Sequence, residues 1–520
     1  MDLPAILTVL IVVLVTVSLR KGRSVSKIKE LPCPNNASLL FGHEWDVFSN
    51  VVGSKFTEWF NKYGPVYRMK GALFHPDILV VADRAAVNHI FSTNSYNYVK
   101  APFFSPVVER LIGRGIIWSE GSLHKRFRRL MDSTFSPAKI RDMSPDVFEA
   151  TSSLQTRLTQ HLQDNHGEAT IDALSWTSST TLDVIGRVGF GYDFKAGESE
   201  EAKAIKEDWA QQVVAGMSPT AFYAEVVLRA FPILLRLPVK SMQAQGRMKV
   251  TMDRLSRRLI ESAESGEDGG KRKGVNFLAT MLNASGEGRM TKQEMIDNVS
   301  HLVIAGYETS AMTASMVLWE LAKNPSCQQK LREELIRLGR EPSYDDLTSN
   351  KDLPYLDAVV KEGLRCFPAA ANYGRVALAD DVLPLETPIT APSGEVLTEL
   401  PIRAGQSINL PHISINTLTS VWPDGELFRP ERWHEPSGLP SKSKALTSWS
   451  GILTFGAGPR MCLGYRLAIL ELKAVLAVLI RNFAFEPTVD VVEKRYAVVL
   501  QPKVVGKEGP QMPLKVVFAT

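Results

Sequence analysis

The stretch Phe455-Gly-Ala-Gly-Pro-Arg-Met-Cys-Leu-Gly464 decides the fold, because it sets a cysteine among closely spaced glycines. Glycines near Cys462 allow a tight backbone turn that presents the sulfur outward. Backbone amides around such a turn can donate to a thiolate and adjust the properties of a metal that it holds. A buried free cysteine beside a glycine-rich turn is the alternative interpretation of the same residues.

The fixed positions of this stretch match F-x-x-G-x-R-x-C-x-G throughout, so that it resembles the haem-binding loop of the cytochrome P450 superfamily. The resemblance implies that Cys462 is the axial thiolate ligand of the iron of haem b, where a thiolate favours cleavage of the O–O bond. It also implies that Arg460 binds a haem propionate and that the ring of Phe455 packs near the sulfur.

Two motifs before the cysteine loop follow the order of the same superfamily. Glu362 and Arg365, in Lys-Glu-Gly-Leu-Arg, lie at i and i+3 on one helix face, where an exposed ion pair is the ordinary interpretation. Phe428-Arg-Pro-Glu-Arg-Trp433 comes next, and the resemblance implies that Arg432 joins Glu362 and Arg365 in a buried structural triad. Loss of one partner would leave an unpaired buried charge, at a cost of roughly 3–5 kcal/mol.

The segment Ala305-Gly-Tyr-Glu-Thr309 lies midway along a helix that capping-box spacing predicts over 291–323. Gly306 costs about 1 kcal/mol relative to alanine in a helix interior, and a solvated stripe is the ordinary interpretation of Glu308 and Thr309. The segment resembles the superfamily pattern A-G-x-[DE]-T. That resemblance implies that Gly306 lets the helix open over the haem, and that Glu308 and Thr309 deliver protons as a general acid relay.

Further haem contacts are implied before and after this helix. In Gly121-Ser-Leu-His-Lys-Arg-Phe-Arg-Arg129, many relatives carry tryptophan where His124 stands. His124 still offers an N–H to a propionate and Arg128 fits the family's arginine, although an ordinary surface histidine is the alternative. Arg375 occupies a region where relatives often place another propionate-binding arginine.

The amino-terminal segment predicts a membrane anchor. Leu3 to Leu19 carries no charge and is long enough to span a bilayer core, and basic residues begin at Arg20. A cleaved signal peptide and a buried core helix are the alternatives, but no cleavage site follows. We therefore expect an anchor over 1–20, a basic and proline-containing spacer over 21–40, and a cytosolic catalytic domain over 41–520, at the endoplasmic reticulum. The N-x-S triplets at Asn36, Asn283 and Asn298 are then expected to stay unmodified.

Composition bounds the rest of the chain. Of 520 residues, 44% are hydrophobic, which excludes a disordered chain, and 60 basic against 56 acidic residues give no case for nucleic-acid binding. Four cysteines exclude a disulfide scaffold, so Cys33, Cys327 and Cys366 are interpreted as packing or surface thiols. Helical periodicity dominates, which predicts a mainly α domain with minor β-sheets. The resemblance implies that this domain has the cytochrome P450 fold.

The resemblance also implies partners and a reaction. No dinucleotide fingerprint or flavin domain is visible, so electrons from NADPH would come through a separate NADPH-cytochrome P450 reductase. Lys125, Arg126 and Arg129 are either its docking rim or a solvated helix face. The implied reaction inserts one oxygen atom of O2 into an apolar small molecule. Residues expected to line the substrate pocket are Phe103, Phe104, Val107, Ile304, Ala305 and Val498.

The substrate class remains open at this stage. The sequence around His124 and 428–433 looks like membrane-bound fungal enzymes, many of which oxidise terpenoids or other secondary metabolites. Fatty acids, polyketides, aromatics and xenobiotics are the alternative substrates. A haem-thiolate isomerase or dehydratase, or a non-catalytic haem sensor, would keep Cys462 but would not need the pair Glu308 and Thr309.

Overall fold

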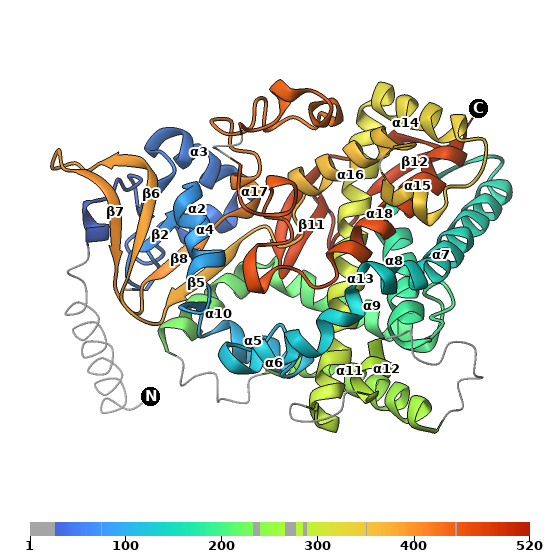
Figure 1. Ribbon diagram of the computed structural model, residues 1–520, viewed down its shortest axis with the longest axis horizontal. Helices are drawn as coiled ribbons and strands as arrows, with labels where there is room; N and C mark the ends of the chain where they lie inside the picture. The colour runs from blue at the N-terminus through green and yellow to red at the C-terminus, as the bar shows by residue number, and fades with distance from the viewer. Residues whose placement is uncertain are drawn as a thin grey trace.

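A long buried helix, α13 (Lys292–Lys323), forms the centre of the molecule (Figure 1). It begins with the predicted capping box: the Thr291 hydroxyl accepts from the Glu294 amide at 3.2 Å, and the Glu294 carboxylate accepts from the Thr291 amide at 2.9 Å. Most of its residues are buried, because the helix is apolar on nearly all sides. The predicted helix over 291–323 is confirmed.

The structure is a computed structural model that describes residues 27–73, 75–231, 240–265, 277–283, 289–349, 351–441 and 445–519. Helices make up most of these residues. They are α2 (Glu44–Ser49), α3 (Ser54–Tyr63), α4 (Arg84–Asn88), α5 (Phe104–Ile112), α6 (Gly121–Asp132), α7 (Pro137–Asp164), α8 (Ala173–Phe190), α9 (Glu200–Gly216), α10 (Pro219–Ala230), α11 (Lys240–Ser265), α12 (Phe277–Asn283), α13, α14 (Pro325–Arg337), α15 (Tyr344–Ser349), α16 (Pro354–Cys366), α17 (His412–Ile415) and α18 (Tyr465–Asn482).

The strands of the described residues form four small sheets. The largest has the order β1-β2-β8-β5-β3, and its first pair is antiparallel with Val66 opposite Val81. This pair confirms the small hairpin that the sequence predicts from Tyr67–Lys70 and Ile78–Ala82, which flank a turn-rich stretch. The other sheets are β6-β7, β10-β11 and β4-β12-β9. The strands are β1 (Val66–Met69), β2 (Ile78–Val81), β3 (Tyr98–Lys100), β4 (Glu168–Asp172), β5 (Tyr373–Ala377), β6 (Asp381–Thr390), β7 (Val396–Ile402), β8 (Ser407–Leu410), β9 (Phe483–Pro487), β10 (Val492–Ala497), β11 (Val499–Val504) and β12 (Pro513–Phe518).

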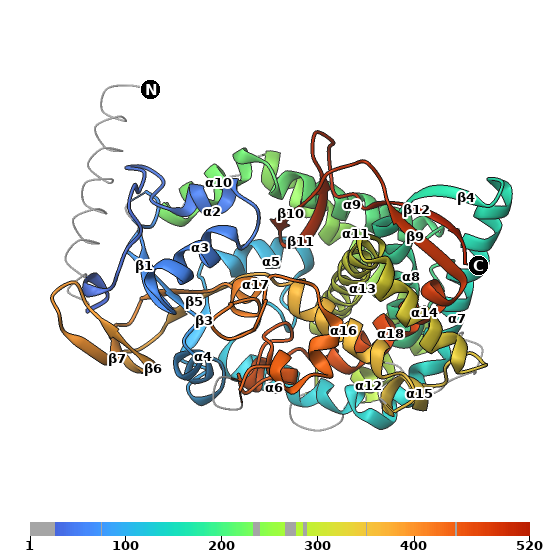
Figure 2. The same ribbon diagram turned by 90° about the horizontal axis from the view of Figure 1, so that it is seen from above.

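The sheet-rich and helix-rich parts have separate apolar cores. One core joins α7, α8, α13, α16 and α18, and the other joins the five-stranded sheet with α3 and the hairpin β6-β7. Figures 1 and 2 show the sheet-rich part at one end of the molecule and the helices at the other. The molecule is thus mainly α with minor sheets, as the sequence predicts.

Two details differ from the sequence-based expectation. The apolar run Tyr496–Leu500 predicts one short strand near the end of the chain. In the structure it turns at Val498, whose φ of 66° lies in the left-handed region, and this makes β10 and β11 a hairpin. The apolar periodicity over 462–482 predicts a helix that begins at Cys462. In the structure this helix begins at Tyr465, because a short 3-10 turn over Gly458–Arg460 and the residues after it form the cysteine loop.

The predicted membrane anchor at Leu3 to Leu19 lies outside the described residues. Within the described ranges, no helix has both the length and the apolar character needed to cross a bilayer. Of the N-x-S asparagines, Asn298 is fully buried in α13, where no sugar could be attached to the folded chain.

Candidate active site

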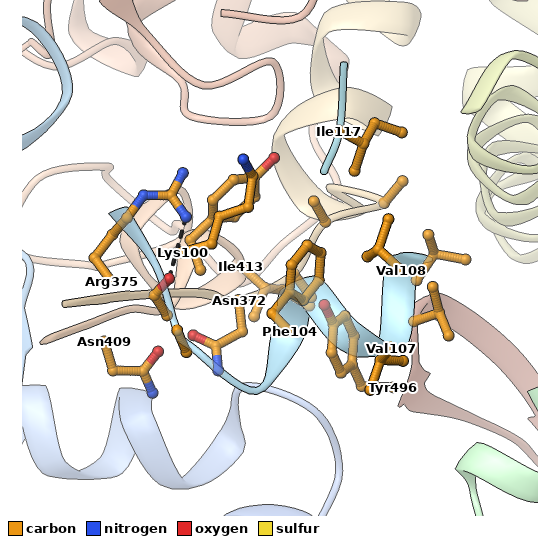
Figure 3. A pocket seen from close by; sticks show the side chains of 18 of the residues that line it. Lys100, Phe104, Val107, Val108, Ile117, Asn372, Arg375, Asn409, Ile413 and Tyr496 are labelled. Carbon is orange, nitrogen blue, oxygen red and sulfur yellow. Dashed lines mark hydrogen bonds between the residues drawn. The ribbon is translucent and has the colours of Figure 1, made fainter. Parts of the chain in front are cut away.

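A pocket of about 1510 Å³ lies between the helical and sheet-rich parts and extends to the surface. The side chains around it form two sides: Lys100, Asn372, Arg375 and Asn409 lie toward one, and the apolar side chains toward the other (Figure 3). The pocket's lining includes every residue predicted as catalytic, haem-binding or substrate-binding. These are Phe103, Phe104, Val107, His124, Arg128, Ile304, Ala305, Gly306, Glu308, Thr309, Arg375, Phe455, Arg460, Cys462 and Val498.

The cysteine loop presents its sulfur to this pocket. The Cys462 amide donates to the Phe455 carbonyl at 2.7 Å and closes the turn. Gly458 has a φ of 62°, and a Cβ there would lie 2.2 Å from the Phe91 carbonyl oxygen, so that only glycine fits. Cys462 borders the pocket, and its exposed surface faces that cavity. The protein atoms around the pocket desolvate the thiol and raise its pKa, which the Gly464 amide and Arg128 partly offset.

The polar side of the pocket carries more positive than negative charge. Glu120 pairs with Arg460 and, at 2.9 Å, with the Lys100 ammonium. Arg375 is buried nearby, stacks on the ring of Tyr373 and donates only to its neighbour, the Gly374 carbonyl, at 3.1 Å. Burial, aided by the charges of Arg460 and Arg375, lowers the pKa of Lys100 to about 8. Two of these three cations share one carboxylate and Arg375 has no ion pair within the described residues, a setting suited to an anionic ligand with two carboxylates.

His124 and Arg128 lie at the edge of this polar side, on α6. The Nδ1 atom of His124 is 3.1 Å from the hydroxyl of Tyr96. Burial first, then Arg460, lowers the pKa of His124 to about 4, so its imidazole is neutral near pH 7 and keeps one N–H. Arg128 donates to the Met461 carbonyl and, at 2.7 Å, to Asp132, which holds its guanidinium against the cysteine loop.

Helix α13 supplies the pocket wall that bears the polar pair. The Thr309 hydroxyl donates to the Ala305 carbonyl at 2.7 Å. Glu308 is buried, which raises the pKa of its carboxyl, and Oε1 accepts from the Gln501 amide nitrogen of β11 at 2.6 Å. Gly306 has a further reason to be glycine, because a Cβ there would lie 2.7 Å from Cδ1 of Ile185 on α8. Close packing of α13 against α8 is therefore one reason for glycine at this position, and the helix opening that the resemblance implies stays a prediction.

The predicted triad forms behind the pocket. Arg365 donates to both Glu362 oxygens, at 2.9 and 2.7 Å, and Arg432 donates to Oε1 at 2.8 Å. All three side chains are fully buried. Arg365 also donates to the Asn416 carbonyl at 3.0 Å, and the Asn416 side chain accepts from the Leu453 amide at 2.8 Å. The triad thereby supports the backbone that leads into the cysteine loop.

The remaining sequence predictions are placed as follows. Cys33, Cys327 and Cys366 are free thiols, and the last two are buried. On α6, Lys125 and Arg129 are exposed, whereas Arg126 forms an ion pair with Glu294.

Lys100, Glu120 and Gln501 are site residues that sequence reasoning missed. Lys100 and Glu120 adjoin the predicted segments at Phe103 and His124, which was the available signal. Gln501 carried none, because the fold alone brings β11 to α13.

Comparison with known proteins agrees with this architecture. The family model for cytochrome P450 matches residues 31–505. The chain is 33% identical to cytochrome P450 monooxygenase claQ of Ampulloclitocybe clavipes, over 96% of this chain and 94% of that protein. It is 32% identical to claP of the same species, over 95% and 94%. It is 31% identical to cytochrome P450 monooxygenase 128 of Postia placenta, over 94% and 92%.

The fold and the thiol-bearing pocket are those of a haem-thiolate oxidoreductase. The chain belongs to the cytochrome P450 family and is a monooxygenase of that family. The family uses haem b, O2 and electrons from NADPH, which a redox partner delivers. Haem b carries two propionates, and the excess positive charge of Lys100, Arg375 and Arg460 over Glu120 fits them.

Proposed function

We propose that the enzyme inserts one oxygen atom from O2 into an apolar small molecule, in the pocket between α13 and the cysteine loop. The observation that carries this proposal is that Cys462 and Thr309, on elements far apart in the sequence, border the same pocket. Its other side is apolar, with Phe104, Val107 and Val108 from α5 facing Tyr496 from β10 (Figure 3).

In this proposal Cys462 holds the haem iron through its thiolate, while Lys100, Arg375, Arg460 and the neutral His124 hold the propionates. Haem, when bound, would activate O2, which is the source of the transferred oxygen atom, while two electrons from NADPH and two protons reduce the other oxygen atom to water. The contacts of Glu120 then matter, since propionates compete with it for Arg460 and Lys100. Release of Glu120 from one of these cations is the adjustment that the site must make.

Glu308 and Thr309 are proposed to move protons. A buried carboxyl with a raised pKa holds a proton more readily than an exposed one, and the amide of Gln501 fixes its orientation. The Thr309 hydroxyl is held by the Ala305 carbonyl, so its oxygen is fixed at the pocket wall. Thr309 would receive the proton from Glu308 and deliver it toward the pocket.

The proposed ligand role of Cys462 is tested by the absorption spectrum of the reduced, carbon monoxide-bound protein. Cys462→Ala should lose the thiolate-type band. Cys33→Ala is the matched control, because Cys33 is half-buried in the segment before β1 and does not line the pocket. Persistence of the thiolate-type band in Cys462→Ala would contradict the assignment.

We propose terpenoids of fungal secondary metabolism as the first substrate class to test, since the aliphatic and aromatic pocket wall suits hydrocarbon skeletons. The ferric protein would be titrated with sesquiterpene and diterpene hydrocarbons and alcohols while the haem spectrum is followed. A saturable high-spin shift with one skeleton supports the class. No shift across the panel, in protein with an intact thiolate spectrum, directs the search to fatty acids, polyketides, aromatics and xenobiotics.

We further propose that residues 1–20 anchor the chain in the endoplasmic reticulum, with 21–40 as spacer and 41–520 as the cytosolic catalytic domain. The proposed electron donor is NADPH-cytochrome P450 reductase, docking at exposed Lys125 and Arg129. Fractionation of cells expressing the full chain and a chain lacking 1–20 tests the anchor. Equal partition of both into membranes would contradict it. The double variant Lys125→Glu, Arg129→Glu tests the docking site. It should slow reduction of the haem iron by the reductase and leave its reduction by dithionite unchanged.

A further inference from the structure

The short segment Gly113–Ile117, between α5 and α6, is bound by polar side chains of α13. The Arg114 amide donates to the Asp297 carboxylate at 2.8 Å, and the Ile116 amide donates to the Asn298 side chain at 2.9 Å. The Ile117 amide donates to Nδ1 of His301 at 3.0 Å. Asp297, Asn298 and His301, called here the α13 clamp, thus accept from three backbone amides of one segment.

The tautomer of His301 follows from these contacts. Nδ1 accepts from the Ile117 amide at 3.0 Å, and Nε2 lies 3.0 Å from the Gly113 carbonyl and 3.2 Å from the Gly115 amide. Because the carbonyl can only accept, we assign the ring proton to Nε2, which donates to Gly113 and then has no lone pair left for the Gly115 amide. The imidazole is completely buried and neutral in this arrangement. One ring therefore holds both ends of the segment, through an acceptor and a donor.

Two glycines let the segment approach α13 this closely. A Cβ at Gly113, whose φ is 92°, would lie 2.3 Å from Oδ1 of Asp297. A Cβ at Gly115 would lie 2.8 Å from Cγ of the His301 ring. No other residue fits at either position without displacing the segment. The sequence Gly113-Arg-Gly115 is thus matched in shape to the clamp as well as in hydrogen bonding.

The clamp is also tied to the neighbouring helix α11. The Lys249 ammonium lies 3.0 Å from Oδ1 of Asp297, and the Gln293 amide nitrogen donates to the same oxygen at 3.0 Å. Asp297 is therefore a paired buried carboxylate, with one oxygen for α11 and α13 and the other for Arg114. A carboxylate with its partners satisfied is a rigid attachment point.

Ile116 and Ile117 line the pocket, and the side chain of Ile117 lies on its apolar side (Figure 3). His301 lies one helical turn before Ala305, so the helix that carries Thr309 also fixes this wall. We propose that the α13 clamp is a specificity-determining device: it sets the distance between the Ile116–Ile117 wall and α13, and thereby selects apolar ligands by size. This inference rests on the proposed function, because it assigns a role within that pocket.

The first experiment measures the clamp directly, by hydrogen exchange and mass spectrometry on peptides that cover residues 113–117. Asn298→Ala and His301→Ala should speed exchange of these amides at least tenfold, because each variant removes an acceptor. His301→Gln, which keeps an amide donor and an acceptor, should restore part of the protection. Exchange as slow in both alanine variants as in the unchanged protein overturns the clamp, whatever the pocket binds.

The second experiment measures selection by size, with imidazole and 4-phenylimidazole as probes of the ferric, haem-loaded protein. Gly115→Ala should raise the dissociation constant of 4-phenylimidazole about tenfold, the effect of losing roughly 50 Å² of apolar contact. Imidazole, which is too small to reach the wall, should bind unchanged. Gly246→Ala is the matched control, because a Cβ at Gly246 meets nothing within 4 Å.

If the ratio of the dissociation constants of 4-phenylimidazole and imidazole is unchanged in Gly115→Ala and His301→Ala, the clamp does not select ligands by size. Should Gly115→Ala not fold, Asn298→Ala serves in its place. Failure of imidazole to perturb the spectrum of the unchanged protein would overturn the proposed haem function and this role with it. The exchange experiment would still report whether the clamp exists, so that the two failures are distinguishable.

Discussion

At the scale of single residues, two buried glutamates differ in charge: Glu362 is ionised, whereas Glu471 is protonated near pH 7. Glu362 accepts from Arg365 and Arg432, from the Arg429 amide at 2.8 Å and from the Trp433 indole at 3.0 Å, and these donors hold its pKa below the usual range. Glu471 on α18 has no comparable donors, and burial raises its pKa to about 8. The number of donors, more than burial, decides the charge.

Glu362→Gln should therefore be severely destabilising. The amide cannot compensate two buried guanidinium groups, so we expect a loss of roughly 3–5 kcal/mol in the free energy of unfolding. The measurements are the urea midpoint and the haem content of purified protein. Glu333→Gln on α14 is the control, since Glu333 is exposed and bonded only to Gln329, at 3.0 Å. Equal midpoints for the two variants would show that the triad is not a stabilising unit.

Thr309→Ala tests the proton relay at the same scale. Removal of the hydroxyl should leave NADPH consumption largely intact but divert it to hydrogen peroxide, lowering product per NADPH by about tenfold or more. Ser315→Ala is the matched control, because Ser315 donates to the Met312 carbonyl at 2.8 Å on the same helix without lining the pocket. Unchanged product per NADPH in Thr309→Ala would exclude Thr309 from proton delivery.

At the scale of elements, the cysteine loop depends on its approach to the helical turn around Phe91. Gly458→Ala should displace the loop, because the added Cβ would lie 2.2 Å from the Phe91 carbonyl and φ is 62°. We expect a loss of half or more of the thiolate-type carbon monoxide signal per protein. Gly339→Ala separates the steric effect of the added Cβ from backbone strain, because Gly339 has a φ of 71° but a Cβ there would meet nothing within 4 Å. An equal loss in both variants would assign the effect to backbone strain alone.

Elements that carry their own local signal could be predicted from the sequence. The helix from Thr291 has its capping box within four residues, and the cysteine loop and the Glu362–Arg365 pair are contiguous motifs. The turn at Val498 could not be predicted, because a left-handed valine is set by the pairing of β10 with β11. Gln501 was missed for a related reason: long-range packing, which no local pattern encodes, brings β11 to α13. Lys100 differs, because it adjoins the predicted segment at Phe103 and could have been found from that neighbour.

At the scale of the whole molecule, four buried histidines, His43 among them, lie in different places, and burial lowers the pKa of each imidazole. Burial, first among the causes, lowers the pKa of His124 and His301 to about 4 and of His412 to about 3. Each takes up a proton when the chain unfolds below about pH 6.5, so each costs stability as the pH falls. Glu471 acts in the opposite direction, since its carboxyl stays protonated in the folded state up to about pH 8. The net pH dependence is a difference between these groups, and single variants are needed to separate them.

His301→Gln isolates one of these contributions. Around His301, the Gly113 carbonyl and Asp297 raise its pKa while Lys249 and Lys100 lower it, but burial dominates and the folded pKa stays at about 4. The stability that neutral His301 contributes is present in full above about pH 6.5, the unfolded pKa, and is lost as the pH falls toward 4. The stability difference between the unchanged protein and His301→Gln should therefore fall by about 1.4 kcal/mol per pH unit over this window. Melting temperatures measured by circular dichroism from pH 7 to 4.5 provide the comparison. A difference that stays flat over this range would mean that the imidazole of His301 is protonated in the fold, which is incompatible with an Nδ1 that accepts from Ile117.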